Sequence, residues 1–164
     1  MMVAMLRILT LALTLALPIP ALAQTVAFGG IKGDSSAPVE ITADQLEVNQ
    51  DTGQATFTGD VLVIQGDMRL NASVLKVDYG SGDASQVQTI TASGSVVLVS
   101  PSEAAESDAA VYDVPNGNLV MTGNVLLTQG QNVMSGQKLT VDMDTGKGQM
   151  DGRVRTILQP GGSK

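Results

Sequence analysis

The chain has 164 residues, carries 9 Lys+Arg against 16 Asp+Glu for a formal net charge of −7, and contains no His, Cys or Trp. The lack of His and Cys excludes the usual zinc sites, Ser–His–Asp or Cys–His catalytic pairs and a disulfide framework. The acidic balance and an aromatic content of 2% exclude a stacking platform or a basic stripe for nucleic acid.

Residues 1–23 have the layout of a secretory signal peptide. Arg7 precedes an uncharged apolar run, residues 8–17, and Ala21-Leu22-Ala23 supplies a small-x-small cleavage pattern. The alternative is a membrane anchor, but the run is shorter than the roughly 20 residues that span a bilayer. We therefore expect cleavage after Ala23, which lowers the formal charge to −8 because Arg7 is lost. Export without cysteine fits a bacterial periplasm or exterior.

The rest of the chain divides into one domain with two soft ends. We expect a flexible N-terminal segment over residues 24–37, a β domain over 38–160 and a short C-terminal tail over 161–164.

Period-two alternation of apolar and polar residues runs through this domain and predicts strands. Ala55, Phe57, Val61 and Val63 share one face of such a stretch. No segment has a convincing helical stripe. Residues 101–110 (PSEAAESDAA) contain helix formers but no apolar periodicity, so we interpret them as a loop or a single turn.

An internal repeat organises the strands into four units. Turn glycines stand at Gly53, Gly82, Gly117 and Gly146, with separations of 29, 35 and 29 residues. A second set stands at Gly59, Gly94, Gly123 and Gly152, and its offsets place a six-residue insertion in the second unit.

Apolar residues recur at fixed offsets from these glycines. Seven residues before the turn glycines stand Leu46, Leu75, Ala110 and Leu139, and five before stand Val48, Val77, Tyr112 and Val141. Two residues after the second glycines stand Val61, Val96, Val125 and Val154. The fixed parity points all of them to one side, so neighbouring units must share one elongated core. A glycine inside each long strand marks a bend or bulge that would fold the stack into two facing layers. A β-jelly-roll or a solenoid fits this pattern, with a parallel β-helix as the main alternative.

Four motifs carry a resemblance to a known family. They are residues 57–66 (FTGDVLVIQG) with 68–72 (MRLNA), residues 121–125 (MTGNV) with 135–139 (SGQKL), residues 38–44 (PVEITAD), and residues 153–160 (RVRTILQP). Because these motifs follow one another along the chain in the family's order and spacing, the chain resembles the OstA-like, or LptA-type, lipopolysaccharide-transport proteins.

The resemblance implies an all-β fold, a twisted, open-ended antiparallel β-jelly-roll built here from about four related strand units. It implies that lipid A acyl chains of lipopolysaccharide lie between the two sheets. It further implies end-to-end self-association into a bridge from an inner-membrane LptC-type protein to an outer-membrane LptD-type protein, in the periplasm. No cofactor, metal or nucleic acid is expected.

The resemblance and the inward parity together select the candidate residues. The candidate lipid-binding residues are Val39, Ile41, Leu46, Val48, Phe57, Val61, Val63, Leu70, Val96, Leu98, Leu119, Met121, Val125, Leu127, Leu139 and Val141. The candidate partner edges are Val39, Glu40 and Ile41 at one end and Val154, Arg155, Thr156 and Ile157 at the other.

Two other interpretations stay open at this stage. The inward set could form a packed, dry sandwich core, and the exported chain could be a structural or adhesive β-solenoid that polymerises without a lipid ligand. An enzyme is not expected, because the carboxylate pairs Asp142/Asp144 and Glu103/Glu106 fit a polar strand face and a loop better than an acid–base site.

Overall fold

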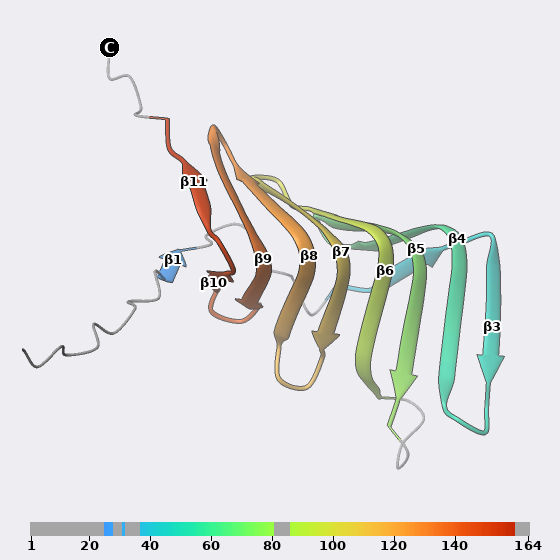
Figure 1. Ribbon diagram of the computed structural model, residues 1–164. Coiled ribbons are helices and arrows are strands. Elements are labelled where there is room, and N and C mark those ends of the chain that lie inside the picture. Colours follow the sequence, from blue (N-terminus) through green and yellow to red (C-terminus); the bar gives the residue numbers. More distant parts are fainter. Residues whose placement is uncertain (1–24, 28–30, 32–36, 81–85, 160–164) are drawn as a thin grey trace, which may run out of the picture.

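The computed structural model describes residues 25–27, 31, 37–80 and 86–159 (Figure 1). The predicted signal peptide and the C-terminal tail lie outside the described residues. The part of the chain that the structure describes contains no helix with the length and hydrophobicity needed to cross a bilayer.

One antiparallel sheet forms the molecule, and its strands follow one another as a meander (Figure 1). The order across the sheet is β1-β10-β9-β8-β7-β6-β5-β4-β2, with β3 also on β4 and β11 also on β9. The strands are β1 (Thr25–Ala27), β2 (Val39–Thr42), β3 (Gln45–Asn49), β4 (Gln54–Gln65), β5 (Met68–Tyr79), β6 (Val87–Val99), β7 (Glu103–Asp113), β8 (Asn118–Gln129), β9 (Asn132–Asp142), β10 (Lys147–Asp151) and β11 (Arg155–Ile157).

The four predicted units appear as four successive pairs of long strands. Each unit has a first strand, a turn and a second strand: β5 and β6 form the second unit, and β7 and β8 form the third. In the outermost units one long strand is split in two. β2 and β3 pair with the two halves of β4, and β11 and β10 pair with the two halves of β9.

The predicted bend glycines lie where the sheet folds over. Gly59, Gly94, Gly123 and Gly152 have φ of +79° to +82°, and the residue after each also has a positive φ. The strand register shifts at the first three of these positions, as a bulge requires. Two layers therefore face each other across one interior, which confirms the open antiparallel jelly-roll. The insertion falls between β5 and β6, in residues 80–86.

The structure corrects the interpretation of residues 101–110. Strand β7 begins at Glu103 and pairs with β6 and β8 along its whole length. Between Glu103 and Tyr112 its inward side chains are small, with Ala105, Ser107 and Ala110 all buried. Buried and exposed residues therefore alternate along β7, but the buried ones are small and only weakly hydrophobic. A search for periodic hydrophobicity does not detect such a strand.

The expected flexible segment 24–37 also differs from the structure in two places. β1 joins the sheet beside β10, and Ile31 is only 1% exposed. Neither position belongs to the repeat, so no periodic signal marked them.

We predict that a Cβ at a bend glycine destabilises the fold because of the side chain that lies against that glycine. A Cβ on Gly94 would lie 2.6 Å from Oγ of Ser73, whereas one on Gly130, which also has a positive φ, would meet nothing within 4 Å. Gly94→Ala should lower the free energy of unfolding by about 2–3 kcal/mol and Gly130→Ala by about 1 kcal/mol. Urea unfolding measures both, and equal losses would show that the close approach to Ser73 does not matter.

Candidate functional site

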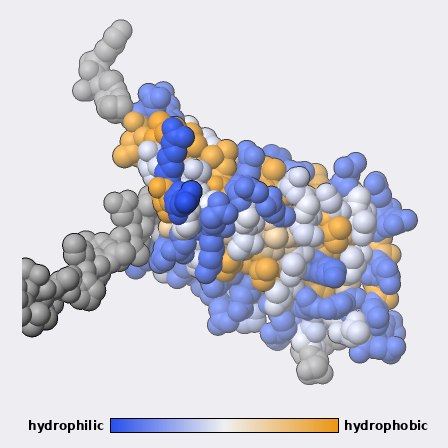
Figure 2. Space-filling model, in the orientation of Figure 1, coloured by the Kyte–Doolittle hydropathy of each residue, from blue (hydrophilic) through white to orange (hydrophobic). Residues whose placement is uncertain are grey.

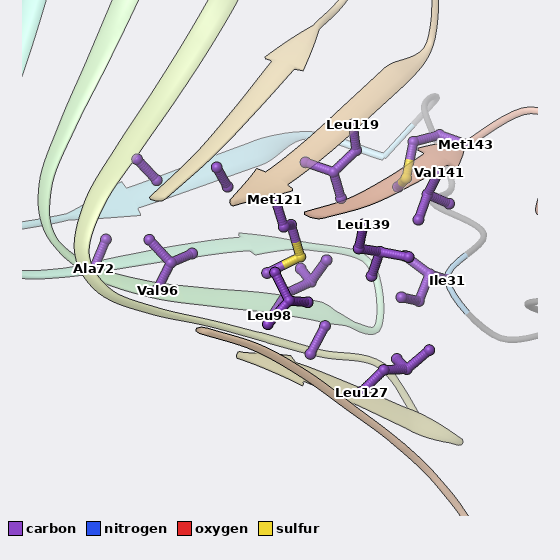
Figure 3. Packing of buried hydrophobic residues seen from close by; sticks show 14 of the residues in the cluster. Ile31, Ala72, Val96, Leu98, Leu119, Met121, Leu127, Leu139, Val141 and Met143 are labelled. Atoms are coloured by element: carbon purple, nitrogen blue, oxygen red, sulfur yellow. The ribbon is translucent and has the colours of Figure 1, made fainter. Parts of the chain in front are cut away.

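The interior is filled at one end of the sheet. Beneath β8 and β9, Met121, Val125, Leu127, Leu139 and Val141 are at most 1% exposed (Figure 3). Along the bend, Val61 and Val96 are equally buried. This part of the molecule is a packed hydrophobic core.

Toward β2 the same interior is hollow. A cavity of about 490 Å³ lies between the two layers, and it is bounded mostly by residues of β2 and β4–β7. Its lining consists of Ala37, Val39, Ile41, Val63, Gln65, Met68, Leu70, Leu75, Val77, Tyr79, Val87, Ile90, Leu98, Tyr112, Val114, Leu119, Met143 and Asp144.

The chemistry of this lining suits an apolar ligand. Among the described lining residues, only Gln65, Asp144, Tyr79 and Tyr112 have polar side-chain groups. The two methionines, Met68 and Met143, are flexible and adapt to irregular shapes. The volume lies within the range of about 300–1,000 Å³ that ligand sites occupy. An aliphatic chain would meet hydrocarbon on nearly every side.

The structure divides the predicted lipid-binding residues into three groups. Six of them line the cavity: Val39, Ile41, Val63, Leu70, Leu98 and Leu119. Val61, Val96, Met121, Val125, Leu127, Leu139 and Val141 belong to the packed core, against which Phe57 is partly buried. Leu46 and Val48 are 57% and 61% exposed, because β3 is an outermost strand and no described segment covers its inner face.

Several cavity residues were missing from the sequence-based selection although the repeat marks them. Leu75 and Val77 occupy the same repeat positions as Leu139 and Val141, and Tyr112 occupies that of Val77. The repeat positions alone would have identified these three. Met143, after β9, lies outside the repeat positions that we used.

The predicted partner residues lie on the outermost strands. Among the described strands, β2, which contains Val39, Glu40 and Ile41, pairs only with β4. By the same measure β11, formed by Arg155, Thr156 and Ile157, pairs only with β9. Figure 2 shows hydrophobic surface at the end that carries β11, where Val154, Ile157 and Leu158 are 46%, 47% and 69% exposed. In the described part of the chain, both ends of the sheet thus combine exposed apolar side chains with an outer strand, β2 or β11, that has one free edge.

The carboxylate pairs do not form an acid–base site. Glu103 is buried and accepts a hydrogen bond from Nε2 of Gln129, whereas Glu106 is exposed on the other face of β7. Asp142 accepts hydrogen bonds from the backbone N–H groups of Thr145 and Asp144, and these bonds, that from Thr145 first, lower the pKa of its carboxyl. Asp142 therefore fixes the β9–β10 turn. Within the described ranges no cluster of His, Cys, Asp and Glu could hold a metal ion.

Tyr112 is the perturbed titratable group of the cavity. Burial, and then the negative charge of Asp144, raise the pKa of its hydroxyl above the ordinary 10.0. Both causes follow from the position of Tyr112 between the layers, where charge is poorly solvated. The neutral phenol is therefore the form that the cavity holds at physiological pH.

Comparisons with known proteins place these features in context. Residues 40–147 match the family described as "LptA/(LptD N-terminal domain) LPS transport protein". An uncharacterized protein of Rhizobium meliloti is 34% identical over 80% of this chain and 76% of its own. The lipopolysaccharide export system protein LptA of Escherichia coli is 28% identical over 92% of this chain and 86% of its own. The crystal structure of LptH, the LptA homologous periplasmic component of the lipopolysaccharide transport device of Pseudomonas aeruginosa, superposes with a TM-score of 0.70 at 19% identity. It covers 78% of this chain and 99% of that one, and shows the same fold.

We predict an alkaline loss of stability that depends on Tyr112. Because its pKa is higher in the folded than in the unfolded chain, its contribution is complete below pH 10.0 and is lost as the pH rises through the folded-state pKa. The free energy of unfolding should therefore fall as the pH rises above 10.0, and it should fall less steeply in Tyr112→Phe. In Tyr79→Phe the absorbance of tyrosinate reports Tyr112 alone, since the chain has two tyrosines. An apparent pKa at or below the ordinary value would contradict the prediction.

Proposed function

The chain belongs to the LptA/LptD N-terminal domain family of lipopolysaccharide transport proteins, and from this premise we propose that it is a periplasmic lipopolysaccharide carrier. It shields the acyl chains of lipid A between its two layers. By associating end to end, it bridges an inner-membrane LptC-type protein and an outer-membrane LptD-type protein and so contributes to outer-membrane assembly.

The single observation that carries the proposal is the apolar cavity at the β2 end of the interior. Each methylene moved from water into such a lining gains about 0.8 kcal/mol, so a few acyl chains supply ample affinity. Charge contributes little in bulk, because the mature chain and its usually anionic ligand both carry negative charge. Recognition of the acyl chains, with no catalytic step, is the expected chemistry.

The exposed ends support the bridging part of the proposal. Leu46 and Val48 in the first unit and Val154 in the last unit occupy repeat positions that are buried in the inner units, except for the partly buried Tyr112 at the position of Val48. A neighbouring molecule that continued the sheet would bury them and pair the free edges of β2 and β11. The exposed ends alone would suit a ligand-free polymer equally well. The hollow interior favours the carrier, because a purely structural solenoid gains stability from a filled core.

Export is the remaining part of the proposal. Signal cleavage after Ala23 would release residues 24–164 into the periplasm with the β domain over 38–160. Energy for transport would come from other components.

Photo-crosslinking in cells tests the lipid site. Ile41 lines the cavity, and the adjacent Glu40 is exposed on the opposite face of β2, so the two positions form a matched pair. A photoreactive residue at position 41 should give lipopolysaccharide adducts, and the same residue at position 40 should give almost none. Equal yields at the two positions would sink the proposed site.

Charge placed on the two ends tests the bridge. Leu46→Asp and Val154→Asp change exposed residues that do not line the cavity, so the fold and the adducts at position 41 should persist. Either change should weaken end-to-end association by at least about tenfold, the factor that about 1.4 kcal/mol supplies. Light scattering measures the association. Val111→Asp, at a 40% exposed site away from both ends, is the control, and an equal effect there would refute edge pairing.

A further inference from the structure

The chain's own N-terminal strand occupies half of one outer edge. β1 pairs antiparallel with β10, with Thr25 opposite Gln149, Val26 opposite Gly148 and Ala27 opposite Lys147. The other half of that edge, β11, pairs only with β9 among the described strands and stays open. One end of the sheet is therefore half closed by a segment that stands outside the four units.

The repeat predicts which strand would otherwise lie at that position. Inside the molecule the first strand of each unit pairs antiparallel with the second strand of the unit before it. The residue five before the turn glycine always pairs with the same repeat position of the preceding unit. Val77 lies opposite Ala55, Tyr112 opposite Ile90 and Val141 opposite Leu119.

Continuing this rule beyond the last unit places β3 of a second copy on β10. Gly148 follows Gly146 by two residues, as Ala55 follows Gly53, so its partner would be Val48 of the second copy. In the single chain that partner is Val26 of β1. β1 and an incoming β3 would thus pair with the same edge, in the same antiparallel direction, and each would place a valine opposite Gly148. β3 and β10 are each five residues long.

A buried side chain accompanies this occupied edge. Ile31 lies four residues beyond β1 and joins the hydrophobic core, and Figure 3 shows it at the end of the cluster beside Leu139 and Val141. The inner face of β3 carries Leu46 and Val48, which are exposed in the single chain. If β3 docked on β10 of a neighbouring molecule, these two side chains would pack against the end of that molecule's core. Ile31 supplies in the single chain the apolar contact that these residues would supply in an assembly.

We infer that β1 and Ile31 form a displaceable intramolecular plug on the docking edge for β3 of a second copy of this chain. This inference rests on the proposed end-to-end association and adds its regulation. The plug covers the β10 half of the edge in the free chain and leaves when another molecule docks. Meanwhile the free β11 offers a first contact.

The plug is suited to displacement. β1 contributes a three-residue pairing, against the five residues of β10 that a docked β3 would pair. Cleavage after Ala23 would leave Thr25 one residue from the chain's beginning, so β1 can leave without unfolding any other strand. Until then the pairing covers an edge that would otherwise invite aggregation.

Two variants of the processed chain test the inference in opposite directions. Thr25→Cys with Gln149→Cys places a disulfide across directly opposed residues, and no native cysteine competes with it. Oxidation of the dilute chain, followed by isolation of the monomer, selects the intramolecular disulfide. Ile31→Asp removes the anchor, and hydrogen exchange at residues 147–151 reports whether β1 has left. The disulfide-locked chain should associate about tenfold more weakly than wild type, with recovery on adding dithiothreitol, and Ile31→Asp about tenfold more tightly.

The possible outcomes separate this inference from the proposed function. Equal association of the locked, reduced and Ile31→Asp chains overturns the plug, as does unchanged hydrogen exchange at residues 147–151 in Ile31→Asp. Lipopolysaccharide adducts at position 41 report the carrier function independently. If those adducts persist while the plug variants behave alike, the plug fails and the carrier stands. If the variants respond as expected but no adducts form, assembly is gated in a chain that does not carry lipopolysaccharide.

Discussion

No unit of this protein can bury its own apolar face, and the rest of the structure depends on that constraint. Each unit is a pair of strands with one hydrophobic side, so it gains stability only by lying between neighbours. Val61, Val96 and Val125 are almost fully buried at one repeat position, whereas Val154, at the same position in the last unit, is 46% exposed. The difference comes from what stands beside the unit. The same forces that fold the chain therefore leave two incomplete ends.

The bend glycines turn this stack into a container. A φ near +80° in mid-strand is costly for a residue with a Cβ, and glycines with this φ recur at the same height in every unit. Along that line the layers meet and are packed by residues such as Val61 and Val96. Away from it the layers diverge, and between them lies the cavity, with Ile41 on one layer and Val77 on the other. A hollow interior is thus a consequence of where the bend lies.

These relations decide how much of the molecule was predictable from its sequence. Periodicity and the glycine repeat give the strand content, the units, the bend and the inward face, because each is a local property of the chain. They do not predict which inward side chains a neighbouring strand covers. Leu46 and Leu75 hold the same repeat position, but Leu46 is exposed and Leu75 is buried in the cavity wall. The boundary between cavity and packed core also depends on side chains from several units at once. β7 escaped detection because small residues such as Ala105 fill its inner face.

The two ends of the sheet are not equivalent, and their difference would give the proposed assembly a direction. The β3 end has its apolar side chains exposed and no segment of the described chain over them, whereas the β10 end is half covered by β1 and sealed by Ile31. In the proposed end-to-end association, docking at the covered end would compete with a contact within the same molecule, so it would favour an incoming strand that pairs more extensively than β1 does. A fragment with partial complementarity would lose that competition. A strand that matches the repeat over all five residues of β10, with apolar residues in the positions of Leu46 and Val48, would win it.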